Sequence, residues 1–107
     1  MRCLIEPGSL ERAARTLVSL EPRHVGKKQP ANVVVLSGFP CLVRETPPTE
    51  TDGPAGSLAI ARAAVSLGYT VTLATDRCNE AVFAAACTDA GTWASSEALS
   101  MDVYPPV

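Results

Sequence analysis

The sequence has one histidine, His24, and few aromatic residues. Its four cysteines lie far apart and form no C-x-x-C pair, so a zinc site is not expected. No segment resembles the apolar region of a secretory signal, and we therefore interpret the cysteines as reduced, mostly buried thiols. They are Cys3, Cys41, Cys78 and Cys87.

Long apolar runs are also missing, since none approaches the ~20 residues of a membrane-spanning helix. Hydrophobic residues make up 47% of the 107 residues and charged residues 19%, which is the balance of one small globular domain. Residues 1–30 carry six Lys and Arg against three Glu, whereas the remainder carries three Arg against eight acids. A nucleic-acid partner needs a clustered basic face, so we expect neither nucleic acid nor a membrane as partner.

Residues 1–30 predict an amphipathic helix followed by a basic linker. Ser9 is the expected N-cap, and Pro22 should end the helix at Glu21. Basic residues near the start are also typical of an organellar transit peptide, but the three Glu in this part favour a packed surface helix. The apolar side comprises Leu10, Ala13, Ala14, Leu17, Val18 and Leu20.

Residues 31–91 predict a βαβα core that includes a long acidic loop. The β-branched run Asn32–Ser37 is too short for a helix, and its consecutive apolar residues suit a central parallel strand covered on both faces. Residues Tyr69–Thr75 alternate apolar side chains with threonines and predict a second strand.

Two helices are expected in this core. Asp52 is the expected N-cap of a largely buried helix that extends to Leu67, with Gly68 just after its end. Asn79 is the expected cap of the next helix, and Gly91 should end it.

Residues 92–107 lack periodicity and predict an irregular tail. We therefore expect a single α/β domain, a Rossmann-like βαβ unit with parallel strands and flanking helices. Two strands make a narrow sheet for such hydrophobic helices, so we interpret the chain as part of a larger three-layer domain. If the buried helix faces lack partners within the chain, self-association is expected.

Acidic and hydroxyl side chains concentrate in the segment Thr49–Gly56, between the first strand and the following helix. Glu50 and Asp52 lie in this segment and Asp76 follows the second strand, so all three are expected at the carboxyl edge of the sheet. A structural interpretation also fits, with Asp52 as a helix cap and Glu50 as a solvated acid. The number of acids at one edge favours a ligand site.

The start of the following helix offers backbone amides to an anion. The amides of Ala55, Gly56 and Ser57 should be free to hold a carboxylate or phosphate, while the acids bind an ammonium group or act as a general base. Donors on one side and acids on the other suit an amino acid. No G-x-G-x-x-G or G-K-[ST] motif follows the strand, so a nucleotide is the weaker alternative. Mg²⁺ bound through water molecules remains open, because acids and threonines occur together.

Three other side chains fit a site less well. Cys41 has no histidine near it in sequence that would activate it as a nucleophile. His24 belongs to a basic linker and is expected in solvent, and Arg62 suits a carboxylate clamp and a solvated helix stripe equally.

Three runs of the sequence follow one another in a specific order and spacing. They are a strand ending in Ser37-Gly38-Phe39-Pro40, the turn Glu50–Gly56 with the pattern E-T-D-G-P-x-G, and a strand ending in Thr75-Asp76. Together with the helix start at Gly8-Ser9-Leu10, they resemble the D-glutamate cyclase family over residues 8–90.

The resemblance implies a lyase of the mitochondrial matrix that converts D-glutamate to 5-oxo-D-proline and water. It implies Glu50 or Asp52 as the base, and Asp76 as its support or as the group that orients the ammonium. No cofactor is expected, and D-glutamate is the expected small-molecule partner. The implied substrate-binding residues are Gly38, Thr51, Gly53, Ala55, Gly56 and Ser57.

Members of this family are longer than this chain, with further strands and helices after the last residue here. We therefore expect the chain to carry the motif in part of a catalytic domain, and its turnover to be weak or absent. The alternative is a non-catalytic α/β module that binds an amino acid or another anion.

Overall fold

The computed structural model describes residues 6–19 and 31–104, in two compact units that comprise residues 1–31 and 32–107. In the first unit, helix α1 (Ser9–Val18) follows Gly8, whose φ of 81° is left-handed. Gly8 therefore occupies the cap position that was expected for Ser9. The helix ends at Val18, before the expected Glu21, and the predicted basic linker lies outside the described residues.

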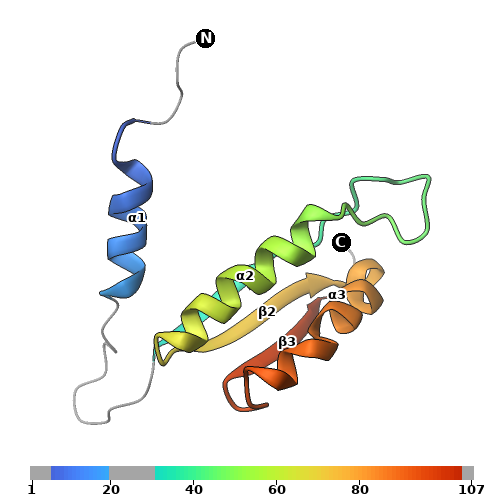
Figure 1. The fold of residues 1–107 in the computed structure, drawn as a ribbon. Coiled ribbons are helices and arrows are strands. Elements are labelled where there is room, and N and C mark those ends of the chain that lie inside the picture. The colour runs from blue at the N-terminus through green and yellow to red at the C-terminus, as the bar shows by residue number, and fades with distance from the viewer. Residues whose placement is uncertain (1–5, 20–30, 105–107) are drawn as a thin grey trace. The chain divides into compact units, whose positions relative to one another are not determined.

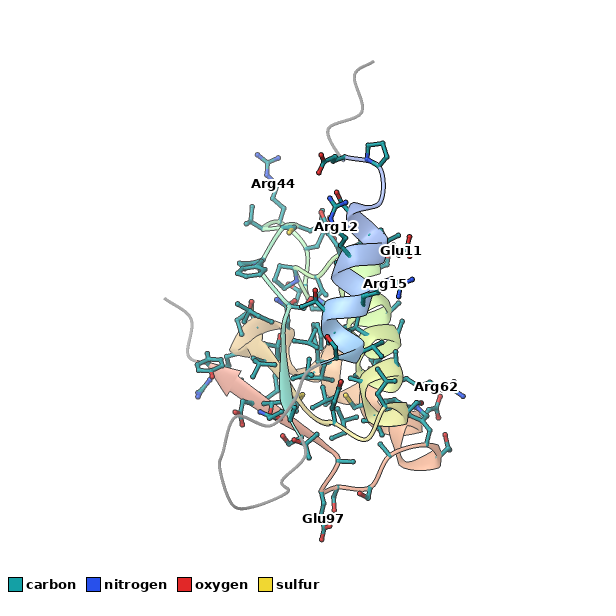
Figure 2. All side chains as sticks on the ribbon, turned by 90° about the vertical axis from the view of Figure 1, so that its left-hand side faces the viewer. Glu11, Arg12, Arg15, Arg44, Arg62 and Glu97 are labelled. Atoms are coloured by element: carbon teal, nitrogen blue, oxygen red, sulfur yellow. The ribbon has the colours of Figure 1, made fainter. Side chains whose placement is uncertain are left out.

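Ion pairs on α1 match the polar side of the predicted amphipathic helix, but no residue of this helix is buried, so the expected packing of its apolar side is not seen. Arg15 contacts Glu11 one turn earlier at 2.8 Å, and Arg12 contacts Glu6 at the same distance. Figure 2 labels Glu11, Arg12 and Arg15 on this helix. Exposed pairs of this kind contribute less than about 1 kcal/mol each, so they support the helix only weakly.

The second unit is an α/β sheet of three parallel strands in the order β1 (Asn32–Leu36), β2 (Thr70–Asp76) and β3 (Leu99–Tyr104). Helices α2 (Asp52–Ser66) and α3 (Glu80–Cys87) make the crossovers, as Figure 1 shows. Short 3-10 turns, η1 (Arg77–Asn79) and η2 (Thr88–Thr92), flank α3. The parallel α/β fold is therefore confirmed.

The core lies between the sheet and the two helices. Val71 and Leu73 point from β2 towards the helices and are almost fully buried, as is Phe83 of α3. Ala61 and Ala64 present small side chains from α2, which lets the helix pack closely on β1 and β2. Burying each of the large side chains stabilises the fold by about 1.5–3 kcal/mol.

Strand β1 was expected at the centre of the sheet, but it is an edge strand. Val34 and Leu36 are 61% and 63% exposed, whereas Val33 and Val35, which alternate with them, are half-buried. A run of consecutive valines therefore does not require burial on both faces. The central strand is β2, which pairs with β1 on one side and β3 on the other.

The tail that was expected to be irregular contains β3. In this strand Leu99, Met101 and Val103 are half-buried and alternate with exposed side chains, which is the pattern of a strand with one covered face. Its register places Met101 beside Leu73, so the tail completes the core.

Helix α2 begins earlier than expected and is covered on one side only. Thr51 takes the cap position and Asp52 is the first helical residue, without a capping bond from the Thr51 side chain. Ile60 and Leu67 are 49% and 44% exposed, so the helix is less buried than its composition suggested. Gly68 follows the helix with a φ of 84°, as expected for a residue that ends a helix. Within residues 6–19 and 31–104, no helix has the length and apolar content needed to cross a membrane.

Candidate functional site at the carboxyl edge of the sheet

Asp76, the last residue of β2, is held by its own chain. Its Oδ1 accepts hydrogen bonds from the thiol of Cys78 at 2.8 Å, the backbone N–H of Asn79 at 3.1 Å and the side-chain Nδ2 of Asn79 at 2.7 Å. The bond from the Asn79 backbone caps the turn η1. Two residues of the following turn, Cys78 and Asn79, thus fix this carboxylate at the carboxyl end of the central strand.

These bonds determine the charge of Asp76. Burial alone raises the pKa of this carboxyl, but the hydrogen bonds from Cys78, from Asn79 and from the backbone of Phe39 outweigh burial. The net effect lowers the pKa below its usual value, so Asp76 is an anion at neutral pH. A carboxylate of this kind suits the binding of a cationic group better than the removal of a proton.

Gly38, which follows β1, approaches Asp76 from the neighbouring strand. Its φ is 137°, a conformation that residues with a side chain rarely adopt. A Cβ on Gly38 would stand 2.7 Å from Oγ1 of Thr75 and 2.9 Å from Oδ2 of Asp76. Glycine is therefore required here both by the backbone and by the two oxygens beside it.

Asn79 connects this edge to the acidic loop. It is fully buried, and while its Nδ2 donates to Asp76, its Oδ1 accepts a hydrogen bond from the hydroxyl of Thr49. A buried amide with both ends paired costs little, whereas removing one partner costs about 1–3 kcal/mol. Thr49 precedes Glu50, so this bond ties the loop that carries Glu50 to the strand end.

Glu50 itself contacts the thiol of Cys41 within the loop. The pKa of this thiol is raised first by loss of solvent contact, then by the charge of Glu50 and its hydrogen bond, and finally by the charge of Asp52. A thiol with a raised pKa is protonated at neutral pH, which does not favour Cys41 as a nucleophile. The same loop contains a cis peptide bond between Thr46 and Pro47.

The start of α2 lies next to the end of β1. A Cβ on Gly53 would stand 3.1 Å from the hydroxyl of Ser37. The Ser57 hydroxyl donates to the Gly53 carbonyl at 2.7 Å, so it is used within the helix. Ala55 and Gly56 are exposed on the first turns.

The start of α2 leaves different backbone amides unpaired from those that the sequence predicted. Because α2 begins at Asp52, the amides of Ala55, Gly56 and Ser57 belong to its hydrogen-bond ladder. The amides without partners inside the helix are instead those from Thr51 to Gly53, because Pro54 has no N–H. The anion-binding end of this helix therefore lies closer to Glu50 than the sequence suggested.

The structure brings part of the predicted site together. Gly38 and Asp76 lie in direct proximity, and the Thr49–Asn79 bond joins them to the loop that carries Glu50. Arg62 is exposed and points outward from α2 in Figure 2. It lies ten residues after Asp52, about 15 Å along the helix, so Arg62 is not favoured as the residue that holds a substrate carboxylate at this site.

Sequence reasoning missed two side chains of this edge. Asn79 was expected only as a helix cap, although an asparagine three residues after an aspartate is typical of a turn closed by the carboxylate. Thr75 was read only as part of a strand. Its Oγ1 is buried and has no hydrogen-bond partner, which in folded proteins is rare.

The described cysteines are free thiols, and they are less buried than expected: Cys41 and Cys78 are exposed and Cys87 is half-buried. Among residues 6–19 and 31–104, no three His, Cys, Asp or Glu side chains are placed to share a metal ion.

One of three comparisons with known proteins identifies the family of the chain. A family model described as "D-glutamate cyclase-like, C-terminal" matches residues 1–104. Comparison with curated proteins and with solved structures gave no match.

Proposed function

Because the chain belongs to the D-glutamate cyclase-like, C-terminal domain family, we propose that it binds D-glutamate and converts it to 5-oxo-D-proline and water. The match over residues 1–104 carries this proposal. The anionic carboxylate at the carboxyl edge of the sheet supports it, because this is where parallel α/β sheets bind their ligands.

The reaction joins two ends of one molecule. The α-amine nitrogen forms a bond to the side-chain carboxyl carbon, a carbon–oxygen bond breaks, and two of the three ammonium protons leave with the oxygen as water. The enzyme must therefore bend the substrate, and it must move protons from nitrogen to oxygen. Holding the amine and the side-chain carboxyl close together in the bound substrate removes a large part of the entropic contribution to the activation barrier.

The residues at the edge divide these tasks. Asp76 remains charged and orients the ammonium group, as its lowered pKa favours. Glu50 or Asp52 takes a proton from the amine and passes it to the departing oxygen. The unpaired amides at the start of α2 hold a substrate carboxylate through hydrogen bonds and the helix dipole.

A direct assay tests the proposal. The chain is incubated with D-glutamate and, separately, with L-glutamate, and formation of 5-oxoproline is followed by chromatography. We expect product from the D-isomer, and a loss of about a hundredfold or more in rate for Glu50→Gln or Asp52→Asn, whichever is the base. Glu97→Gln, a change at an exposed residue, serves as the control. Absence of product at high enzyme concentration would contradict the proposed activity.

A non-catalytic amino-acid-binding module is the second candidate, because an anionic Asp76 anchors a cation whether or not a reaction follows. Binding and turnover distinguish the two. If Glu50→Gln and Asp52→Asn retain D-glutamate binding but abolish turnover, the chain is an enzyme. If the wild type binds D-glutamate without forming product, it is a binding module.

We also propose the mitochondrial matrix as the location, on the basis of the family alone. Fractionation of cells that express the full chain with a C-terminal tag checks this. Recovery of the tagged chain in the cytosolic fraction would contradict it.

A further inference from the structure

Strand β1 forms an open edge of the sheet. It pairs with β2 on one side, and in the part of the chain that the structure describes no strand lies beyond it on the other. The N–H of Ser37 donates to the carbonyl of Ala74 in β2, and successive residues of a parallel strand turn their backbone groups to opposite sides. The same alternation directs Val34 and Leu36 away from β2, with their N–H and C=O groups at the open edge.

The side chains of these two residues are uncovered as well. Val34 and Leu36 are 61% and 63% exposed. Val34 lies beside Thr72 in the register, on the face of the sheet opposite to the one that carries α2 and α3. Unpaired backbone groups and exposed apolar side chains on the same strand are the features of an edge to which another strand adds.

The absence of charge on β1 indicates which strand that is. In a dimer with a twofold axis each contact is repeated, so a charged residue near the centre of a self-paired strand comes close to the like charge of its copy. The strand β1 (Asn32–Leu36) contains no charged residue and no proline. At the other edge of the sheet, β3 carries the exposed Asp102 near its middle, a feature that opposes pairing. Of the two edges, β1 is therefore the one that can pair with itself.

We propose that β1 is a dimer interface, in which the β1 strands of two copies of the chain pair antiparallel about a twofold axis and join their sheets into one. In the register centred on Val34, this residue exchanges both backbone hydrogen bonds with the partner's Val34, and Leu36 pairs with the partner's Asn32. The Val34 side chains of the two copies then lie side by side and cover each other from water.

This interface leaves the candidate site of each copy free. Because the paired strands are antiparallel, Gly38 at the end of β1 and the partner's Gly38 lie at opposite ends of the strand pair. The dimer therefore does not depend on the proposed function. A strand of five residues makes a small interface, so we expect pairing to be weak and to depend on concentration.

Sedimentation equilibrium of the full chain from about 10 μM to 1 mM tests the proposal, and the wild type should show a monomer–dimer equilibrium in this range. Val34→Lys and Val34→Glu each place like charges opposite one another, so each should weaken the dimer at least about tenfold. An equimolar mixture of the two variants pairs Lys with Glu and should recover dimers to within about threefold of the wild type. Tyr104→Lys is the matched control, since it adds the same charge at a residue of β3 that is 54% exposed, and it should dimerise as the wild type does.

Three outcomes would overturn the proposal. The first is a wild-type chain that stays monomeric throughout the concentration range. The second is a dimer that Tyr104→Lys disrupts and Val34→Lys does not, which would assign the interface to β3. The third is failure of the mixed variants to recover dimers, which would contradict the register.

Amide hydrogen exchange in the wild type tests the same contact without any substitution. The N–H groups of Val34 and Leu36 face the open edge, so we expect their exchange to slow as the concentration of the chain rises. The N–H of Val35 faces β2 and should exchange at a rate that does not depend on concentration. A dimer that leaves the exchange of Val34 and Leu36 unchanged would also overturn the proposal.

Discussion

The hydroxyl of Thr49 donates a hydrogen bond to Oδ1 of Asn79, thirty residues later in the chain. On its other side the same amide donates to Asp76. One buried side chain thus holds the loop after β1 and the strand end of β2 in a fixed relation. The bond holds the backbone of the loop beside Glu50, which is the next residue after Thr49.

Thr49→Val should release the loop. The variant leaves Oδ1 of the buried Asn79 without a donor, so we expect a loss of about 1–3 kcal/mol in the free energy of unfolding. Denaturant unfolding measures it. Thr88→Val removes a hydroxyl from an exposed position and should change stability by less than about 0.5 kcal/mol. Equal stability of Thr49→Val and the wild type would show that the loop is held by other contacts.

Gly38→Ala should damage both the fold and the site. The added Cβ would meet two oxygens at 2.7 and 2.9 Å, and the backbone φ of 137° disfavours any side chain. We expect a loss of about 1–3 kcal/mol in stability and a loss of ligand binding. Gly91→Ala is the matched control, since nothing lies within 4 Å of its added Cβ. If both variants unfold at the same denaturant concentration, the result would contradict the close contact between Gly38 and Asp76.

Asp76→Asn should destabilise the chain in a pH-dependent way. The pKa of Asp76 is lowered in the folded state, so its charged form stabilises the fold above the unfolded-state value of about 3.9. This contribution is lost as the pH falls through the lower folded-state pKa. The gap in unfolding free energy between wild type and variant should therefore be largest near neutral pH, about 1 kcal/mol, and shrink in acid. A pH-independent gap between wild type and Asp76→Asn would contradict the prediction.

Glu50→Gln should make Cys41 more reactive. The charge of Glu50 and its hydrogen bond help to raise the pKa of this thiol, so removing the charge increases the thiolate fraction at a given pH. We expect alkylation by iodoacetamide at mildly alkaline pH to accelerate about two- to fivefold, as followed by peptide mass spectrometry. Cys87 provides an internal control, because burial alone raises its pKa. An unchanged Cys41 rate would place Glu50 away from the thiol.

Much of the fold could be predicted because its signals are local. The β-branched run after residue 31 and the alternation before Asp76 indicated two strands that the structure confirms almost residue by residue. The third strand was missed although Leu99, Met101 and Val103 alternate with polar residues. Serines before it and prolines after it suggested a loop, and they outweighed a short alternating pattern.

The candidate site was predictable only as far as topology determines it. Parallel strands end at one edge, and this alone predicted that Asp76 would lie at the same edge as the end of β1. The close approach of Gly38 to Asp76 was not predicted. The pairing of Thr49 with Asn79 joins a loop to a turn, and no periodicity indicates such a contact. The unpaired hydroxyl of Thr75 is likewise visible only when the neighbours of the strand are known.

The carboxylate of Asp76 closes the turn η1 and also lies at the carboxyl edge of the sheet, beside Gly38. A mutation of Asp76 that abolished substrate binding would therefore also remove a bond that stabilises the turn η1. Selection for a folded protein alone would then preserve the aspartate, even in descendants that no longer use it. Retention of Asp76 in a relative is thus insufficient to assign activity.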